Sequence, residues 1–233
     1  MQCLAALCLA LLCAASAAKA AEAGACPGAT VWAAAHPQES EEARAARDVF
    51  ASSARSATHP ALRAELAERA ARDQQTRIAA LASGNDSAAW RAVAQVDKEN
   101  VFWLQALVRT QGFPTAAQVG EQGVFDAWLL AHHADRAPAF RASLLPVIEQ
   151  RALQGELPLG DLARFTDRIL KRQGQPQRYG TQFSPEEWAG PHFGLPDAAS
   201  VQAVEANRRA LGIMPLADYV CMMREARKGR PSD

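Results

Sequence analysis

The chain has 233 residues and a formal net charge of zero, because 25 Lys and Arg residues balance 25 Asp and Glu residues. A nucleic-acid partner needs a basic patch or stripe, so this balance gives no reason to expect one. Ala, Leu, Arg, Glu and Gln dominate while Ile, Thr and Tyr are scarce, which favours helices, and the length suits one domain with its own core.

The N-terminus is typical of a cleaved secretory signal peptide, although its first residues carry no Lys or Arg. Residues 4–18 form an unbroken run of apolar and small residues, shorter than the roughly 20 that a membrane-spanning helix needs. Small residues suited to signal peptidase follow at 15–17 and 18–20. We predict a signal peptide over residues 1–20, a periplasmic or secreted location and no transmembrane anchor.

Two cysteines, Cys26 and Cys221, remain after this cleavage. Two thiols in an oxidising compartment are candidates for one disulfide. Two independent cysteines, one of them a small buried apolar group, are an equal alternative. Residues 23–26 also loosely match a lipidation signal, so a lipid anchor at Cys26 is a minority alternative.

The mature chain is predicted to be one all-α domain over residues 39–228, after an extended segment over 21–38 and before a polar tail over 229–233. Apolar residues recur at helical spacing, with proline in first turns and glycine after last turns. No internal repeat, long linker or alternating strand pattern is present. The predicted helices cover residues 40–56, 60–82, 88–111, 124–135, 138–154 with a kink at Pro146, 158–172, a short helix from Pro185, 198–211 and a last helix from Pro215.

Two polar residues lie on predicted apolar helix faces. Asp73, followed by Gln74, shares a stripe with two leucines, and an unpaired buried carboxylate is costly. Asn100 shares a stripe with Val96 and Trp103, and a buried Asn needs hydrogen-bond partners. Each has a functional and a structural interpretation: ligand binding, or pairing of Asp73 with an arginine and of Asn100 with nearby backbone.

The predicted helix 124–135 ends in His132-His133-Ala134-Asp135. Such a cluster can supply a general base with its orienting carboxylate, here His133 and Asp135. The alternative is a helix end with hydrogen-bonded histidines.

The stretch from Gln173 to Gln182 follows Asp167-Arg168 and is dense in polar and turn-forming residues. In an extended segment Gln177, Tyr179 and Thr181 point the same way. Three neutral hydrogen-bonding groups on one side suit a polar ligand, and they equally suit a loop that satisfies buried backbone groups.

Recognisable cofactor chemistry is absent from the sequence. It contains no Gly-rich phosphate loop, dinucleotide fingerprint, G-x-S-x-G elbow, H-E-x-x-H or C-x-x-C motif. We expect neither a cofactor nor a metal ion.

Several elements resemble an uncharacterised bacterial family, domain of unknown function 6624. The matching elements, in the same order, are Asp73-Gln74, Asn100, His133-Ala134-Asp135, Asp167-Arg168 and Gln177-Arg178-Tyr179-Gly180-Thr181. The resemblance implies a shared helical domain and supplies no established activity.

The leading hypothesis is a secreted helical domain with a polar cleft that binds a small polar or peptide-like ligand. The predicted ligand-binding residues are Asp73, Gln74, Asn100, Asp167, Arg168, Gln177, Tyr179 and Thr181. One alternative is a hydrolase-like enzyme in which His133 is the general base, Asp135 orients it, and Arg168 or Tyr179 stabilises negative charge. Another is a structural or interaction module with an internal polar network.

Overall fold

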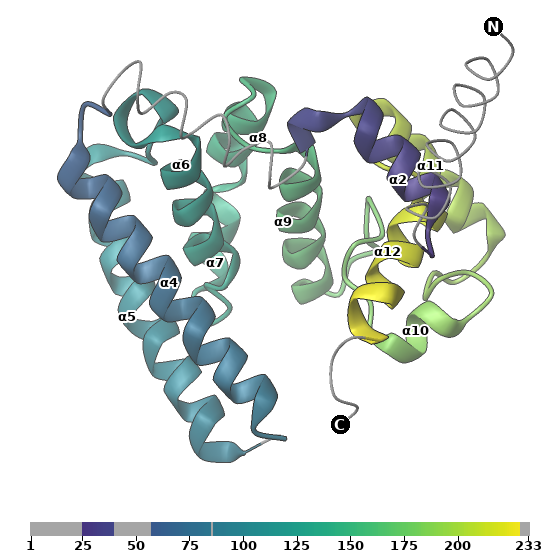
Figure 1. Cartoon of the computed structure of the whole chain (residues 1–233), viewed down its shortest axis with the longest axis horizontal. Coiled ribbons are helices and arrows are strands. Elements are labelled where there is room, and N and C mark those ends of the chain that lie inside the picture. Colours follow the sequence, from purple (N-terminus) through teal and green to yellow (C-terminus); the bar gives the residue numbers. More distant parts are fainter. Residues whose placement is uncertain (1–24, 40–56, 85, 229–233) are drawn as a thin grey trace, which may run out of the picture.

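The protein is a single all-α domain (Figure 1). The computed structural model describes residues 25–39, 57–84 and 86–228, and these ranges contain helices and no strand. The predicted fold class is therefore confirmed. The helices are α2 (Pro27–Ala35), the 3₁₀-helix η1 (Pro37–Glu39), α4 (Pro60–Ala82), α5 (Ser87–Gln111), α6 (Ala116–His132), α7 (Pro138–Ser143), α8 (Leu145–Leu153), α9 (Leu159–Arg172), α10 (Pro185–Ala189), α11 (Ala198–Leu211) and α12 (Leu216–Lys228).

The main hydrophobic core joins α4, α5, α6, α8 and α9. These helices contribute Leu66, Leu104, Trp128, Ile148 and Phe165, respectively, all of which are buried. α4 packs along both α5 and α6, whereas α9 lies beside α7 and α8. Figure 1 shows α4 to α7 on one side, α9 in the middle, and α2 with α10 to α12 on the other side.

Local sequence signals set the boundaries of the first helices. Pro60 occupies the first turn of α4. The Asp86 side chain caps α5 by accepting hydrogen bonds from the first backbone N–H groups, and Gly112, with φ of 79°, ends it. Thr115 and Gln118 form a reciprocal capping box at the start of α6. Because of this box, α6 begins at residue 116, earlier than predicted.

The predicted helix 138–154 is two helices in the structure, with Leu144 between them. Pro146 has no N–H to donate, and its ring excludes a normal helical approach to the carbonyl of Ala142. Leu144 keeps right-handed helical angles, with φ of −82° and ψ of −14°, so the helix is interrupted at one residue, in agreement with the kink predicted at this proline.

The C-terminal half follows its predicted caps closely. Ser184 and Glu187 form a capping box at α10. Asp197 caps α11 by accepting from Ser200 N at 2.7 Å. Gly212 ends α11 in the left-handed conformation, with φ of 78°. These signals place α11 and α12 as expected, and both pack against the end of the Gln173–Gln182 stretch.

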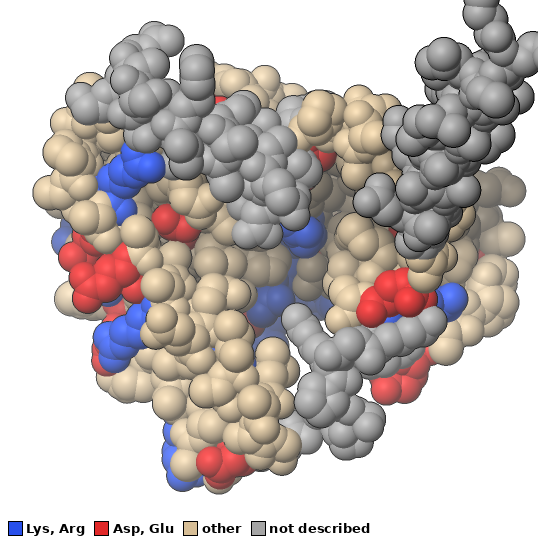
Figure 2. Space-filling model, in the orientation of Figure 1, with Lys and Arg blue, Asp and Glu red and all other residues tan. Residues whose placement is uncertain are grey.

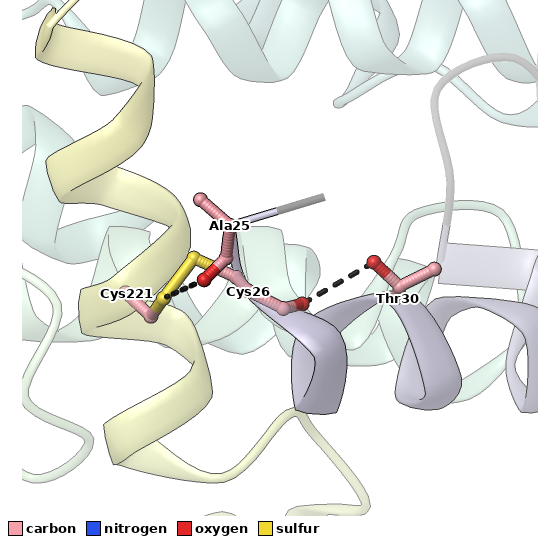
Figure 3. The surroundings of a disulfide bond; sticks show 4 residues. All are labelled: Ala25, Cys26, Thr30 and Cys221. Carbon is pink, nitrogen blue, oxygen red and sulfur yellow. Dashed lines mark hydrogen bonds between the residues drawn. A yellow bond between two sulfur atoms is a disulfide. The ribbon is translucent and has the colours of Figure 1, made fainter. Parts of the chain in front are cut away.

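The prediction of an extended segment over residues 21–38 is wrong in its described part, because α2 occupies Pro27–Ala35. Proline at the first helical position and an Ala-rich sequence favour this helix. Cys26, the N-cap, forms a disulfide with Cys221 on α12, with the Cα atoms 5.7 Å apart (Figure 3). The Thr30 hydroxyl donates to Cys26 O at 3.2 Å and closes the first turn. A sulfur bonded to Cys221 leaves no thiol for a lipid thioether, so the structure argues against lipidation at Cys26.

The α2–η1 segment is fastened to the rest of the domain at both ends. Near the disulfide, Ala29 packs with Met214 and Tyr219. At the other end, the Glu39 carboxylate accepts hydrogen bonds from Leu159 N and Gly160 N, each at 3.0 Å. A carboxylate at this position also interacts favourably with the N-terminal dipole of α9.

Three predicted segments lie outside the described residues: the signal peptide over 1–20, the helix over 40–56 and the tail over 229–233. Among the helices that are described, none combines the length and the apolar character that crossing a membrane requires.

Candidate functional site

The polar residues predicted to form one site lie in three clusters, each centred on an aspartate. The remaining predicted residue, Asn100, lies apart from these clusters. Its side-chain oxygen accepts a hydrogen bond from Arg69 Nη1 at 3.3 Å. The Asp73 cluster contains Asp73, Gln74, Arg77, Asp97 and His133; the Asp135 cluster contains Asp135, Arg141 and Arg168; the Asp167 cluster contains Asp167, Gln177, Tyr179, Thr181 and Arg208.

The Asp73 cluster joins α4 to the end of α6. His133 Nδ1 donates to Asp73 Oδ2 at 2.9 Å, and Gln74 Nε2 donates to the same oxygen at 2.8 Å. Arg77 bridges Asp73 to Asp97 on α5. Asp73 is only 1% exposed, whereas the His133 side chain is 15% exposed. The histidine therefore has a buried, fully engaged carboxylate behind its ring and an edge that reaches solvent.

The pKa values of the two carboxylates in this cluster are shifted in opposite directions. Burial would raise the pKa of Asp73, but the hydrogen bond from His133 and the charges of His133 and Arg77 outweigh it and lower that pKa. For Asp97, burial dominates over Arg77 and raises the pKa. Asp73 is thus the more firmly ionised of the two.

The pairing predicted between His133 and Asp135 is replaced by two different pairings. His133 binds Asp73, and Asp135 binds two arginines. Arg168 grips Asp135 with two nitrogens, Nε at 3.1 Å and Nη2 at 2.5 Å, and Arg141 Nη1 donates to Oδ1. The chain turns after α6. Asp135 therefore points toward α7 and α9, whereas the ring of His133 faces α4.

The Asp135 cluster forms the floor of a hollow of about 660 Å³. Burial would raise the pKa of Asp135, but Arg168 and Arg141 outweigh it and lower that pKa. Arg141 is 1% exposed, and its Nε has no partner among the described residues. Figure 2 shows basic atoms recessed between the α4–α7 side and the α9–α12 side of the molecule. The hollow is lined by Asp135, Arg141, Arg168, Lys171, Arg172, Thr181, Gln182, Phe183, Ser184 and Met223.

The Asp167 cluster is an internal clasp that shapes the Gln173–Gln182 stretch. The Asp167 carboxylate, 0% exposed, accepts from Arg178 N at 2.7 Å, Tyr179 N at 3.0 Å and Thr181 N at 2.9 Å. The Thr181 hydroxyl donates a fourth hydrogen bond at 2.9 Å. Burial raises the pKa of Asp167 even though these four donors oppose the effect. The carboxylate therefore acts as the organising centre of the loop.

Side chains from two other elements complete the clasp. The Gln177 amide pairs with both backbone groups of Gln182, at 2.7 and 2.9 Å. Arg208 on α11 donates to Tyr179 O and Met214 O, each at 2.6 Å. Arg208 is 2% exposed, and the partners of its guanidinium are these backbone carbonyls. Of the two interpretations of this stretch, its hydrogen bonds fit the one in which it satisfies buried backbone.

His132 belongs to the core and not to a polar site. Its ring stacks on Trp128 with centroids 4.9 Å apart. Burial, together with the nearby positive charge of Arg168, holds its pKa well below the usual value, so it is neutral.

Sequence reasoning missed Arg77 and Arg141 as members of the clusters. Arg77 follows Asp73 by four residues, so helical spacing could have identified it. Arg141 is six residues past Asp135, and its contact with Asp135 depends on the turn between α6 and α7, which helical spacing does not specify. Within the described ranges, no three His, Cys, Asp or Glu side chains are grouped to hold a metal ion.

Comparison with known proteins identifies a family but no individual relative. Neither the curated proteins nor the solved structures contain a match to the chain. A family model described as a family of unknown function, DUF6624, matches residues 60–230. This range includes all three clusters and most of the chain, and it confirms the resemblance predicted from the sequence. The protein therefore belongs to the DUF6624 family.

Proposed function

We propose that the protein is a secreted or periplasmic domain that binds a small peptide-like ligand through its carboxylate in the hollow of the Asp135 cluster. The observation that supports this proposal most directly is the positive charge of that hollow. Four basic side chains line it, Arg141, Arg168, Lys171 and Arg172, against one acid, Asp135. Glu187, outside the lining, neutralises part of this charge by approaching Lys171 at 3.5 Å.

The arrangement of the arginines suits a carboxylate. Asp135 already holds the guanidinium of Arg168 in a bidentate contact, which fixes its plane and leaves further N–H groups for a second anion. Burial of Arg141 keeps it oriented without cost when the ligand arrives. A preorganised pair of guanidinium groups is a typical carboxylate-binding arrangement.

Neutral groups beside the cations favour a peptide-like body. Gln182 and Ser184 line the same hollow and bring an amide and a hydroxyl group that suit amides. Phe183 and Met223 add apolar surface. Together they match a short peptide or an acylated amino acid better than a bare inorganic anion.

Calorimetric titration with N-acetyl-dialanine, and with its C-terminal amide as the matched neutral ligand, tests this proposal. We expect the acid to bind, the amide to bind at least tenfold more weakly, and affinity for the acid to fall as salt rises. Arg168→Gln and Arg172→Gln should each weaken binding. Arg109→Gln, which removes an exposed charge from the end of α5, is the control and should change nothing. Equal binding of acid and amide would refute the proposal.

A second candidate function rests on the geometry of His133. With Asp73 accepting from Nδ1 at 2.9 Å, the neutral ring carries its lone pair on Nε2, the arrangement of a general base with an orienting carboxylate. In this alternative, Asp73 takes the role that the sequence assigned to Asp135. The reaction would be hydrolysis, with Nε2 accepting a proton from water.

Hydrolysis of p-nitrophenyl acetate above the uncatalysed rate is the screening assay for this alternative. His133→Gln should abolish the activity, and Asp73→Asn should reduce it by disturbing the ring's tautomer. Persistence of the activity in His133→Gln would exclude the alternative. Loss of peptide binding in that variant is not expected, so the two candidate functions are separable.

A further inference from the structure

A second cavity, of about 380 Å³, lies between α2, α9 and the segment joining α11 to α12. It is separate from the hollow of the Asp135 cluster, although Thr181 borders both. Its walls come from distant parts of the chain, because the disulfide and the Glu39 contacts hold the α2–η1 segment against α9 and α12. Concave, mostly apolar cavities with a few polar groups are the usual places for small ligands.

The walls are aromatic and sulfur-rich. Trp32 and His36 stack with centroids 4.2 Å apart and planes 9° apart, and the His36 Nδ1–H donates to Trp32 O at 2.8 Å. Tyr219 and two methionines, Met214 and Met222, contribute to the apolar surface, together with Phe125 and Ile213. Aromatic faces and flexible thioethers pack well against a planar ring.

Among the polar residues that line the cavity are Asp161 and Arg164, on the first turns of α9. Asp161 is 0% exposed; Arg164 Nη2 donates to its Oδ1, and its Oδ2 has no partner among the described residues. An unsatisfied buried oxygen is costly, and a ligand donor there would remove the cost. The Arg164 side chain is 39% exposed, so it has N–H groups to offer an incoming acceptor. This part of the cavity thus presents one acceptor next to one donor.

The surrounding charges disfavour a charged ligand. A ligand anion would face Asp161 and Glu39, while a ligand cation would face Arg164 and Arg208. A neutral head with a donor and an acceptor side by side satisfies both groups. We propose that this cavity binds a small aromatic molecule carrying a primary carboxamide: the ring packs between Trp32 and Tyr219, the N–H donates to Asp161 Oδ2, and the carbonyl accepts from Arg164.

Three nearly isosteric probes test the head group: benzamide, benzoate and benzamidine. Binding to the full mature chain is measured by ligand-detected NMR and by calorimetry. We expect benzamide to bind at least about tenfold more tightly than benzoate or benzamidine, because only it satisfies both polar groups. Failure of benzamide to bind, or equal binding of the charged probes, would overturn the proposal.

A matched pair of alanines on α2 tests the location. Both Ala33 and Ala34 are exposed, but only Ala33 lines the cavity. Ala33→Leu should weaken benzamide binding by at least about tenfold by filling the cavity, and Ala34→Leu should leave it unchanged. Equal effects of the two substitutions would overturn the assignment to this cavity.

Asp161→Asn tests the hydrogen-bonding pattern. If the oxygen of the new amide stays on Arg164, the amide N–H₂ takes the place of the unpaired Asp161 Oδ2, so a donor replaces an acceptor. Preference should then move from benzamide toward benzoate, whose oxygen can accept from that donor. Unchanged preference in a variant whose circular dichroism matches the wild type would overturn the role of Asp161 and with it the proposal.

Discussion

Replacing Asp167 with Asn should lower the free energy of unfolding of the domain, because the Asp167 carboxylate holds the clasp together. The carboxylate accepts four hydrogen bonds, two on each oxygen, from Arg178 N, Tyr179 N, Thr181 N and the Thr181 hydroxyl. An Asn side chain can accept two of them through its oxygen. Its N–H₂ group would face the other two donors. When that group faces Thr181, the hydroxyl can rotate to accept from it but the backbone N–H cannot, so at least one contact would be lost and one donor left buried and unsatisfied.

The size of the effect follows from these contacts. A hydrogen bond to a charged group contributes about 1.5 to 3 kcal/mol, so losing one predicts a loss of about 1.5 to 3 kcal/mol in the free energy of unfolding. Burial raises the pKa of Asp167, which means that the ionised carboxylate carries a desolvation cost that Asn avoids. We therefore expect the lower part of that range, about 2 kcal/mol. Domains of this kind have total stabilities of roughly 5 to 15 kcal/mol.

Urea denaturation followed by circular dichroism measures the change. Glu149→Gln removes a carboxylate from an exposed position on α8 and should alter the unfolding free energy by less than about 0.5 kcal/mol. A loss below about 1 kcal/mol in Asp167→Asn would refute the reasoning, because it would mean that the loop keeps its shape without the carboxylate.

Three further predictions concern other parts of the fold. Removing the Cys26–Cys221 disulfide, which joins residues 195 apart in the sequence, should lower the unfolding free energy by up to about 5 kcal/mol in the chain-entropy model. Urea denaturation of the double Cys→Ser variant measures this loss. No change would show that α2 detaches before the domain unfolds. The pKa of Asp73 is lowered in the folded state, so its contribution to stability is present above its unfolded pKa and is lost as pH falls through the folded value; Asp73→Asn should therefore flatten acid denaturation curves, and an unchanged acid midpoint would contradict this. Gly180→Ala should cost about 1 to 3 kcal/mol, because φ is +67° there and the added Cβ would lie 3.1 Å from Leu216 Cδ1; a melting temperature equal to that of the wild type would contradict the strain.

The helices were predictable because their start and stop signals are local. The prediction of a helix from Pro60 to Ala82 matches α4 at both ends, since proline at the first turn and the Ser-Gly pair after Ala82 mark them directly. Asp197 and Gly212 mark α11 in the same way. The interruption between α7 and α8 was predictable as a kink, because Pro146 cannot donate the hydrogen bond that a continuous helix needs at its position.

The polar clusters were only partly predictable. The sequence identified Asp73, His133, Asp135 and Asp167 as unusual, but it paired His133 with the nearest acid along the chain. The observed partner, Asp73, is 60 residues away, and a helical pattern does not specify which helices become neighbours. The roles of Arg141 and Arg208 depend on the same tertiary arrangement.

The bond between Cys26 and Cys221 closes residues 26–221 into a covalent ring. A single peptide-bond cut anywhere between these residues would convert that ring into two chains that remain joined through sulfur. A nicked molecule would run as one species on a non-reducing gel and as two after reduction. Loss of one loop to a protease would therefore not release α2, and the wall that it contributes to the aromatic cavity would stay attached to α12.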